Sequence, residues 1–309
     1  MTQSFPFLWI AKKNQSLTQL MGSDLKNIQS TLYSHGAIMF RGFDVDSQEK
    51  LEKVVSSYPG DSMDYIDGNS PRTKLDKKVY TSTEHPAELF ISLHNELSYS
   101  KSWPGQLFFC CVTPAEKGGA TLIADSRKIL EKLSSETLSA FREKGVRYIR
   151  NLHSGIGSGP SWQTTFEAET RAEVEEVCKK DDIQFSWQDD GSVRVYQNRP
   201  AIHIHPETKE EVWFNQADQF HPSTNPEEVF LALMEIYEDD LHCMPQYASF
   251  ANGDEIPLEM LEEVREVAAQ CTVDFPWEKG DLMLVDNVLA AHGRSPFEGD
   301  RLVLVAMSK

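Results

Sequence analysis

A histidine and a glutamate stand two residues apart in the stretch SLHNELSY, as His94 and Glu96. If this stretch forms a strand, side chains at positions i and i+2 point to the same face, so the two would project side by side. Two such groups can bind one metal ion together with a third ligand from elsewhere in the chain. The alternative is a solvated strand face, which is the commoner origin of an isolated pair of this kind.

A candidate for the third ligand is His292, in the stretch AAHGR at the end of an apolar segment. A strand end is a rigid place from which to present a ligand. His94, Glu96 and His292 together would form a group of two histidines and one carboxylate. Such a group leaves positions on the metal open and is typical of non-haem Fe(II) oxygenases.

A second set of histidines offers an alternative metal site. His203 and His205 flank a turn rich in polar residues, and His221 follows sixteen residues after His205. Three histidines can hold zinc. Polar residues beside a turn are usually solvated, which favours an ordinary structural role for this set.

Arg301 is a candidate anion-binding residue, because it opens the otherwise apolar stretch RLVLVAM. A buried charge at the head of a core strand needs a partner of opposite sign. A guanidinium group binds a carboxylate through two parallel hydrogen bonds. The partner is therefore either the carboxylate of a ligand or an acidic side chain of the protein itself.

The overall charge argues against two classes of partner. Thirty Lys and Arg against 48 Asp and Glu give a formal net charge of −18, and no basic run is visible. Nucleic acid and anionic membranes both require basic surface, so neither is expected as a partner. No apolar run approaches the roughly 20 residues that span a bilayer. The five cysteines lack framework spacing, which predicts reduced thiols and a soluble, cytoplasmic protein.

The order of predicted elements indicates the fold class. Strand-like segments occupy both ends of the chain, and a helix-bearing region lies between them. This order does not suit a regularly alternating α/β enzyme. It predicts one mainly β domain over residues 1–309, a β-sandwich or jelly roll, with an α-helical insertion at roughly 126–270.

Several stretches together resemble the taurine-dioxygenase-like family of Fe(II)/2-oxoglutarate oxygenases. Within that family they are similar to amino-acid hydroxylases of natural-product pathways, such as the syringomycin-type aspartyl hydroxylases. The stretches are TSTEHPAELFISLHNELSYS, TPAEKGGATLIADSR, RPAIHIHPETKEEVWFNQ and GDLMLVDNVLAAHGRSPFEGDRLVLVAM, with HGAIMFRGF nearer the start. They cover nearly the whole chain in order.

The resemblance implies a double-stranded β-helix with a lid-forming insertion, and it implies a role for each matching residue. His94, Glu96 and His292 match the iron ligands. Thr121, at the end of the turn GGAT, and Arg301 match the residues that hold the distal carboxylate of 2-oxoglutarate. The implied cofactor and cosubstrates are Fe(II), 2-oxoglutarate and O2.

The resemblance further implies hydroxylation of an unactivated C–H bond in an amino acid or a derivative, either free or tethered to a carrier protein. Desaturation is the alternative outcome on the same scaffold. Many family members have aspartate where this chain has Glu96. Related halogenases have a small residue there, so the resemblance favours hydroxylation over halogenation. Arg294 and Asn215 are the predicted substrate contacts, and a zinc metallohydrolase or a non-catalytic cupin-like metal-binding protein is the alternative of another class.

Overall fold

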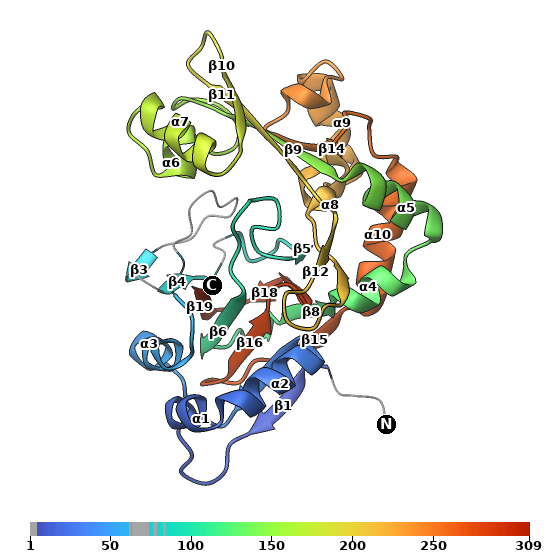
Figure 1. The fold of residues 1–309 in the computed structure, drawn as a ribbon. Coiled ribbons are helices and arrows are strands. Elements are labelled where there is room, and N and C mark those ends of the chain that lie inside the picture. Colours follow the sequence, from blue (N-terminus) through green and yellow to red (C-terminus); the bar gives the residue numbers. More distant parts are fainter. Residues whose placement is uncertain (1–4, 62, 64–73, 77–78, 83–84) are drawn as a thin grey trace.

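The computed structural model describes residues 5–61, 63, 74–76, 79–82 and 85–309. Two sheets carry the core of this part of the chain (Figure 1). The larger sheet has the strand order β1 (Phe7–Ile10), β2 (Ala37–Arg41), β16 (Leu282–Asp286), β6 (Gln106–Thr113), β19 (Leu302–Ser308), β4 (Val79–Thr81) and β3 (Lys74–Asp76). The smaller sheet has the order β15 (Val273–Phe275), β8 (Thr121–Asp125), β17 (Ala290–Arg294) and β5 (Ile91–His94).

The larger sheet is buried on both faces. Its central strands are accordingly continuous apolar runs, in which apolar and polar residues do not alternate. Met39, Phe109 and Met283 project from one face and pack with Ile123 and Ala290 of the smaller sheet. The opposite face packs against helices near the N-terminus, which lie at the bottom of Figure 1. These helices are α1 (Leu17–Ser23), α2 (Leu25–His35) and α3 (Gln48–Ser57).

The helix-rich middle of the chain builds a third sheet and a helical layer. The third sheet has the order β10 (Gln184–Trp187), β11 (Val193–Arg199), β9 (Val146–Leu152) and β14 (Gln246–Phe250), and it lies at the top of Figure 1. The helices are α4 (Ser126–Lys132), α5 (Ser135–Lys144), α6 (Trp162–Phe166), α7 (Arg171–Lys180), α8 (Ala217–Phe220), η1 (Pro222–Thr224), α9 (Glu227–Ile236), η2 (Leu241–Cys243) and α10 (Leu258–Cys271). Two short pairs complete the fold: β12 (Ile202–Ile204) with β13 (Glu211–Trp213), and β7 (Lys117–Gly118) with β18 (Phe297–Glu298).

The structure has the substantial β-sheet content that the sequence predicts, together with helices, but one predicted strand is wrong in its extent. The alternation in residues 92–99 predicts a strand across the whole stretch. In the structure β5 ends at His94, and the residues after Asn95 form a turn in which Leu97 has a φ of 56°. Glu96 therefore projects from a turn, where the backbone is shaped by tertiary contacts.

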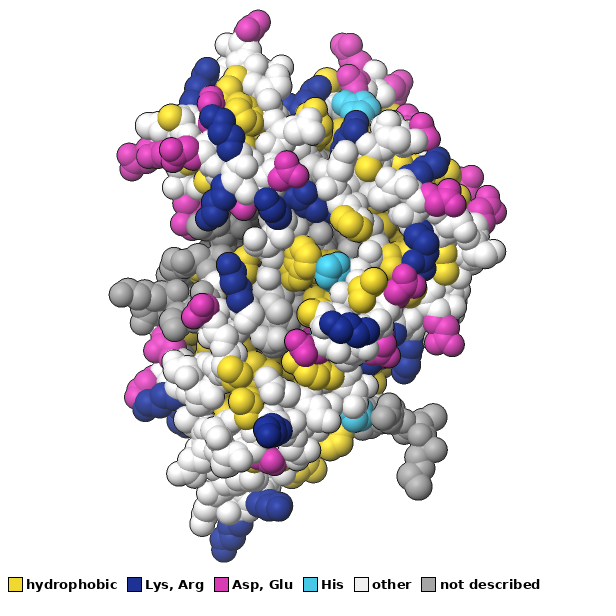
Figure 2. All heavy atoms as spheres, in the orientation of Figure 1, with side chains coloured by type: hydrophobic (Ala, Val, Ile, Leu, Met, Phe, Trp, Pro, Cys, Tyr) yellow, Lys and Arg dark blue, Asp and Glu magenta, His cyan; other side chains and the backbone are white. Residues whose placement is uncertain are grey.

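Charged side chains of both signs are interspersed on the face shown in Figure 2, and acidic residues gather along its upper and right-hand edges. Within the described residues, no helix combines the length and apolar character that crossing a membrane requires. Few charged residues are buried, and they include Glu96, Asp281 and Asp286. Since charges are rarely buried without partners, these positions indicate specific contacts in the interior.

Replacing Leu284 by alanine tests the two-faced core. Leu284 is fully buried in the cluster formed by the larger sheet and the N-terminal helices. We expect Leu284→Ala to lower the free energy of unfolding by about 2–5 kcal/mol, because it leaves a cavity. Urea denaturation measures the loss. The control is Leu302→Ala at the exposed start of β19, for which we expect a loss of roughly 0.5 kcal/mol or less. Equal losses in the two variants would contradict this description of the core.

Candidate active site

Two histidines meet where β5 pairs with β17. The strands are antiparallel, and His292 lies directly opposite His94 in their register. Because opposed residues in such a pair project to the same face, their rings lie close together, with centroids 4.3 Å apart. The pairing of two strands distant in sequence therefore brings these two imidazoles to one point.

Glu96 joins them from the turn that follows β5. Its Oε2 lies 3.6 Å from Nε2 of His292. One potential ligand atom from each of His94, Glu96 and His292 lies within 4.8 Å of the others, and all three side chains are buried. Within the described residues, this is the group of histidine, cysteine and acidic side chains that has the geometry to hold a metal ion.

Asn287 fixes the backbone of Glu96. The amide N–H of Glu96 donates to Oδ1 of Asn287 at 2.7 Å, and Nδ2 of Asn287 donates to the carbonyl oxygen of Glu96 at 3.0 Å. Asn95 is not part of the ligand group, and its Nδ2 donates to the carbonyl oxygen of Asn287 at 2.7 Å. Both asparagines are buried. The two buried amides thus hold the turn in one conformation.

The ring of His94 is oriented by its Nδ1. This atom lies 2.9 Å from the carbonyl oxygen of Ser92 and 3.1 Å from the side-chain amide of Gln219. With Nδ1 engaged by protein groups, Nε2 is the atom through which His94 would bind a metal. In His292, the buried Nδ1 has no hydrogen-bond partner among the described residues.

The donor set fits a divalent cation such as Fe(II). Two neutral imidazoles and one carboxylate are the ligands that non-haem iron takes, and three ligands on one side leave further positions open. An adjacent positive charge stabilises a buried carboxylate such as that of Glu96. A bound cation supplies that charge.

Thr121 and Arg301 lie beside this group. Thr121 is buried in β8, and its Oγ1 accepts a hydrogen bond from Nε1 of Trp277 at 3.2 Å. Nε of Arg301 donates to the carbonyl oxygen of Gly119 at 2.9 Å. Gly119 has a φ of +68°, and a Cβ there would lie 3.0 Å from Cδ of Arg301. Only glycine therefore allows the turn to approach the arginine this closely.

One small cavity joins the two groups of residues. His94, His292, Thr121 and Arg301 all line it, together with Arg294 and other residues. A ligand in this cavity would have both imidazoles and the guanidinium group among its neighbours.

Arg301 has no carboxylate within ion-pair distance among the residues that the structure describes. Burial, together with the positive charge of Arg294, lowers the pKa of its guanidinium to about 10. The group remains protonated near neutral pH, so the site holds an uncompensated positive charge. Such a charge in a cavity favours an anionic ligand.

The two predicted substrate contacts, Arg294 and Asn215, form hydrogen bonds with backbone groups of the protein. Arg294 donates to the carbonyl oxygens of His85 at 3.1 Å, Pro86 at 2.6 Å and Leu89 at 3.1 Å. Its side chain lines the small cavity, so it lies beside the candidate anion site.

Asn215 is placed differently. Its Nδ2 donates to the carbonyl oxygen of Ala201 at 3.0 Å, and its Oδ1 accepts from the amide of Ala217 at 3.1 Å. It lines a second cavity, of about 270 Å³, between β5, α8 and α10, and His94 lines this cavity too. Substrate contact by Arg294 or Asn215 stays a prediction.

The alternative three-histidine site is not assembled in the structure. His203 packs against Trp103 and Phe214. His205 forms a hydrogen bond with Asp286. Nδ1 of His221 lies 2.8 Å from the hydroxyl of Ser223.

The sequence alone did not reveal Asn287, which holds the backbone of Glu96, or Gln219, which contacts the ring of His94. The only available signal for Asn287 was a polar residue directly after an apolar strand.

Replacing Arg301 by methionine tests whether its charge stabilises the fold. Breaking a structural buried ion pair costs about 3–5 kcal/mol. The described residues place no acid within ion-pair distance of Arg301. In the absence of 2-oxoglutarate we therefore expect Arg301→Met to lower the free energy of unfolding by less than about 2 kcal/mol. This loss corresponds to the hydrogen bonds of the arginine side chain. Chemical denaturation in the absence of metal and cosubstrate measures this. A loss of the size of a broken ion pair would assign the arginine a structural partner.

The comparisons agree with this geometry. The family model described as "Taurine catabolism dioxygenase TauD, TfdA family" matches residues 3–307. The dapdiamide synthesis protein DdaC of Enterobacter agglomerans is 37% identical over 280 residues, which cover 91% of this chain and 84% of that protein. A clavaminate synthase-like protein of Arabidopsis thaliana is 28% identical over 302 residues, covering 94% of this chain and 87% of that one.

A solved structure shares the fold. PvcB from Pseudomonas aeruginosa superposes with a TM-score of 0.56 at 15% identity, covering 98% of this chain and 86% of its own. The match of the family model over almost the whole length decides the assignment. The chain belongs to the TauD/TfdA family, and it is a 2-oxoglutarate-dependent dioxygenase that uses Fe(II) and O2.

Proposed function

We propose that His94, Glu96 and His292 bind Fe(II), and that Arg301 and Thr121 hold the distal carboxylate of 2-oxoglutarate. The observation that carries this proposal is the partly buried Arg301, which shares a cavity with both histidines and has no acid within ion-pair distance among the described residues. A dicarboxylate bound between the metal and the arginine would neutralise both charges.

We further infer that the two core sheets are those of a double-stranded β-helix within one domain. The shared core of Met39, Phe109 and Met283 with Ile123 supports this. The insertion at roughly 126–270 acts as a lid over the mouth of the site. Its third sheet lies apart from the core sheets, on the side away from the N-terminal helices (Figure 1).

The proposed reaction is hydroxylation of an unactivated C–H bond of an amino acid or amino-acid derivative, free or tethered to a carrier protein. When bound, the metal and 2-oxoglutarate supply the oxidation by O2, with succinate and CO2 as the other products. The protein's own residues orient the cosubstrate, hold the ligands and exclude water from the site. Arg294, whose side chain lines the cavity, and Asn215 are the proposed substrate contacts.

The names of the relatives support an assignment to natural-product metabolism. DdaC takes part in dapdiamide synthesis, and a second structure of PvcB describes it as an Fe, alpha-ketoglutarate dependent oxygenase from an isonitrile synthetic pathway. Glu96 fills the carboxylate position of the ligand group, which supports oxygen insertion over halogenation. Desaturation of the same substrate is the competing outcome.

Anaerobic titration with Fe(II) and 2-oxoglutarate tests the ligand assignment. We expect a weak visible charge-transfer band in the wild-type protein, because the cosubstrate chelates the iron. His292→Ala should abolish the band, since it removes a ligand. His221→Ala is the control, because His221 is also buried but lies outside the ligand group, and it should retain the band. Absence of a band in the wild type, with tight binding of zinc, would favour a metallohydrolase or a non-catalytic metal-binding protein instead.

Succinate release tests the substrate class. We expect free or carrier-loaded amino acids to stimulate succinate formation, and the product mass identifies the reaction. A gain of one oxygen atom indicates hydroxylation, and a loss of two hydrogen atoms indicates desaturation. If no amino acid in either form stimulates succinate release above the substrate-free rate, the proposed substrate class is wrong.

A further inference from the structure

The turn between β16 and β17 carries the residues that shape the ligand group. Asp286 ends β16, Asn287 holds the backbone of Glu96, and β17 leads to His292. A shift of this turn would move two of the three proposed ligands together. What holds the turn therefore determines the geometry of the site.

Asp286 holds the turn from inside. Its Oδ1 accepts hydrogen bonds from the amides of Val288 and Leu289, both at 3.0 Å. Its own amide donates to the carbonyl oxygen of Gly36 at 2.9 Å. One carboxylate oxygen thus satisfies two backbone donors of the turn, and the other oxygen is directed elsewhere.

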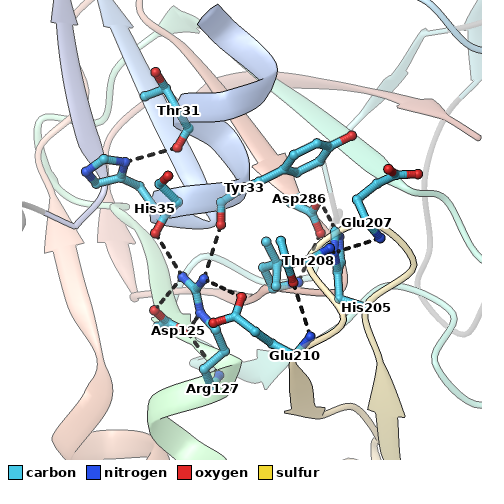
Figure 3. A network of polar contacts seen from close by, with 12 residues as sticks. Thr31, Tyr33, His35, Asp125, Arg127, His205, Glu207, Thr208, Glu210 and Asp286 are labelled. Carbon is cyan, nitrogen blue, oxygen red and sulfur yellow. Dashed lines mark hydrogen bonds and ion pairs between the residues drawn. The ribbon is translucent and has the colours of Figure 1, made fainter. Parts of the chain in front are cut away.

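The other oxygen meets a histidine from the insertion. Nε2 of His205 lies 3.1 Å from Oδ2 of Asp286, and both side chains are almost fully buried. Figure 3 shows the two side chains pointing toward one another, with the ring of Tyr33 close by. His205 follows β12 and begins the loop to β13, about eighty residues before Asp286 in the sequence.

The protonation of His205 follows from its other nitrogen. Nδ1 faces the amides of Glu207 at 3.3 Å and Thr208 at 3.0 Å, and both amides can only donate. Nδ1 is therefore the acceptor, and Nε2 carries the hydrogen that is donated to Asp286. The hairpin loop sets the tautomer that the turn requires.

We propose that His205 is a positioning residue of the metal site. Through Asp286 it fixes the turn whose Asn287 holds Glu96, so that the β12–β13 hairpin of the insertion is mechanically linked to the ligand group. The inference rests on the proposed ligand set. It extends that proposal, because it gives a residue outside the cavity a defined effect on metal affinity.

Two substitutions separate the two hydrogen-bonding edges of His205. The amide of asparagine reaches about as far as Nδ1, and the amide of glutamine reaches about as far as Nε2. His205→Asn therefore keeps an acceptor for the amide of Thr208 and loses the contact with Asp286. His205→Gln retains a donor to Asp286 and serves as the rescue variant.

Binding of Mn(II) to the protein without 2-oxoglutarate, measured anaerobically by electron paramagnetic resonance, tests the proposal. We expect His205→Asn to weaken the affinity about 10–100-fold, as is usual when a group that orients a ligand is lost. His205→Gln should return it to within about threefold of wild type, which a loss of general packing would not do.

Thr137→Val is the matched control. Thr137 is buried, and its hydroxyl donates to Glu263 at 2.5 Å in a contact between α5 and α10. The Thr137→Val substitution should lower the free energy of unfolding and leave the Mn(II) affinity unchanged. If wild type binds Mn(II) and His205→Asn binds it equally well, or if Thr137→Val weakens binding as much, the role of His205 is wrong and the ligand set stands. If wild type does not bind Mn(II), the proposed ligand set fails and the role of His205 fails with it.

Discussion

The antiparallel pairing of β5 with β17 is the constraint on which the site depends. It sets His292 opposite His94, and the turn after β5 adds the carboxylate of Glu96. Every surrounding layer helps to hold this pairing. The larger sheet packs against one face of the smaller sheet, α4 and α10 contact β8 in that same sheet, and buried amides hold the turn. A polar centre can exist in this interior only because its neighbours have few alternative positions.

The positive charge of Arg301 marks the place where an anionic ligand is expected to bind. The protein has an excess of acids, yet Arg301 lies partly buried with no acid in reach among the described residues. Burial and the nearby charge of Arg294 lower its pKa to about 10, and this shift reflects a cost that the folded protein bears without a ligand. A ligand carboxylate would remove that cost. Local rules of stability are broken most clearly at functional sites, and Arg301 follows this pattern.

Part of this site could be predicted from the sequence. Residue type and spacing made His94 and Glu96 candidates, and the place of an arginine at the head of an apolar strand made Arg301 one. Their expected roles came from the resemblance to the family. The strand predicted across residues 92–99 was too long, because the side chain of Asn287, nearly two hundred residues away, shapes the turn. The partners of Arg294 are backbone carbonyls, which spacing cannot reveal. The link from His205 to Asp286 depends on tertiary contacts that have no local pattern.

The most direct test of the proposed site is a crystal structure of the protein grown anaerobically with Mn(II) and N-oxalylglycine, with anomalous data collected for the metal. We expect one anomalous peak between His94, Glu96 and His292, and the distal carboxylate of the inhibitor against Arg301 and Thr121. A metal bound by other residues would contradict the proposed ligand set. So would an inhibitor whose distal carboxylate makes no contact with Arg301.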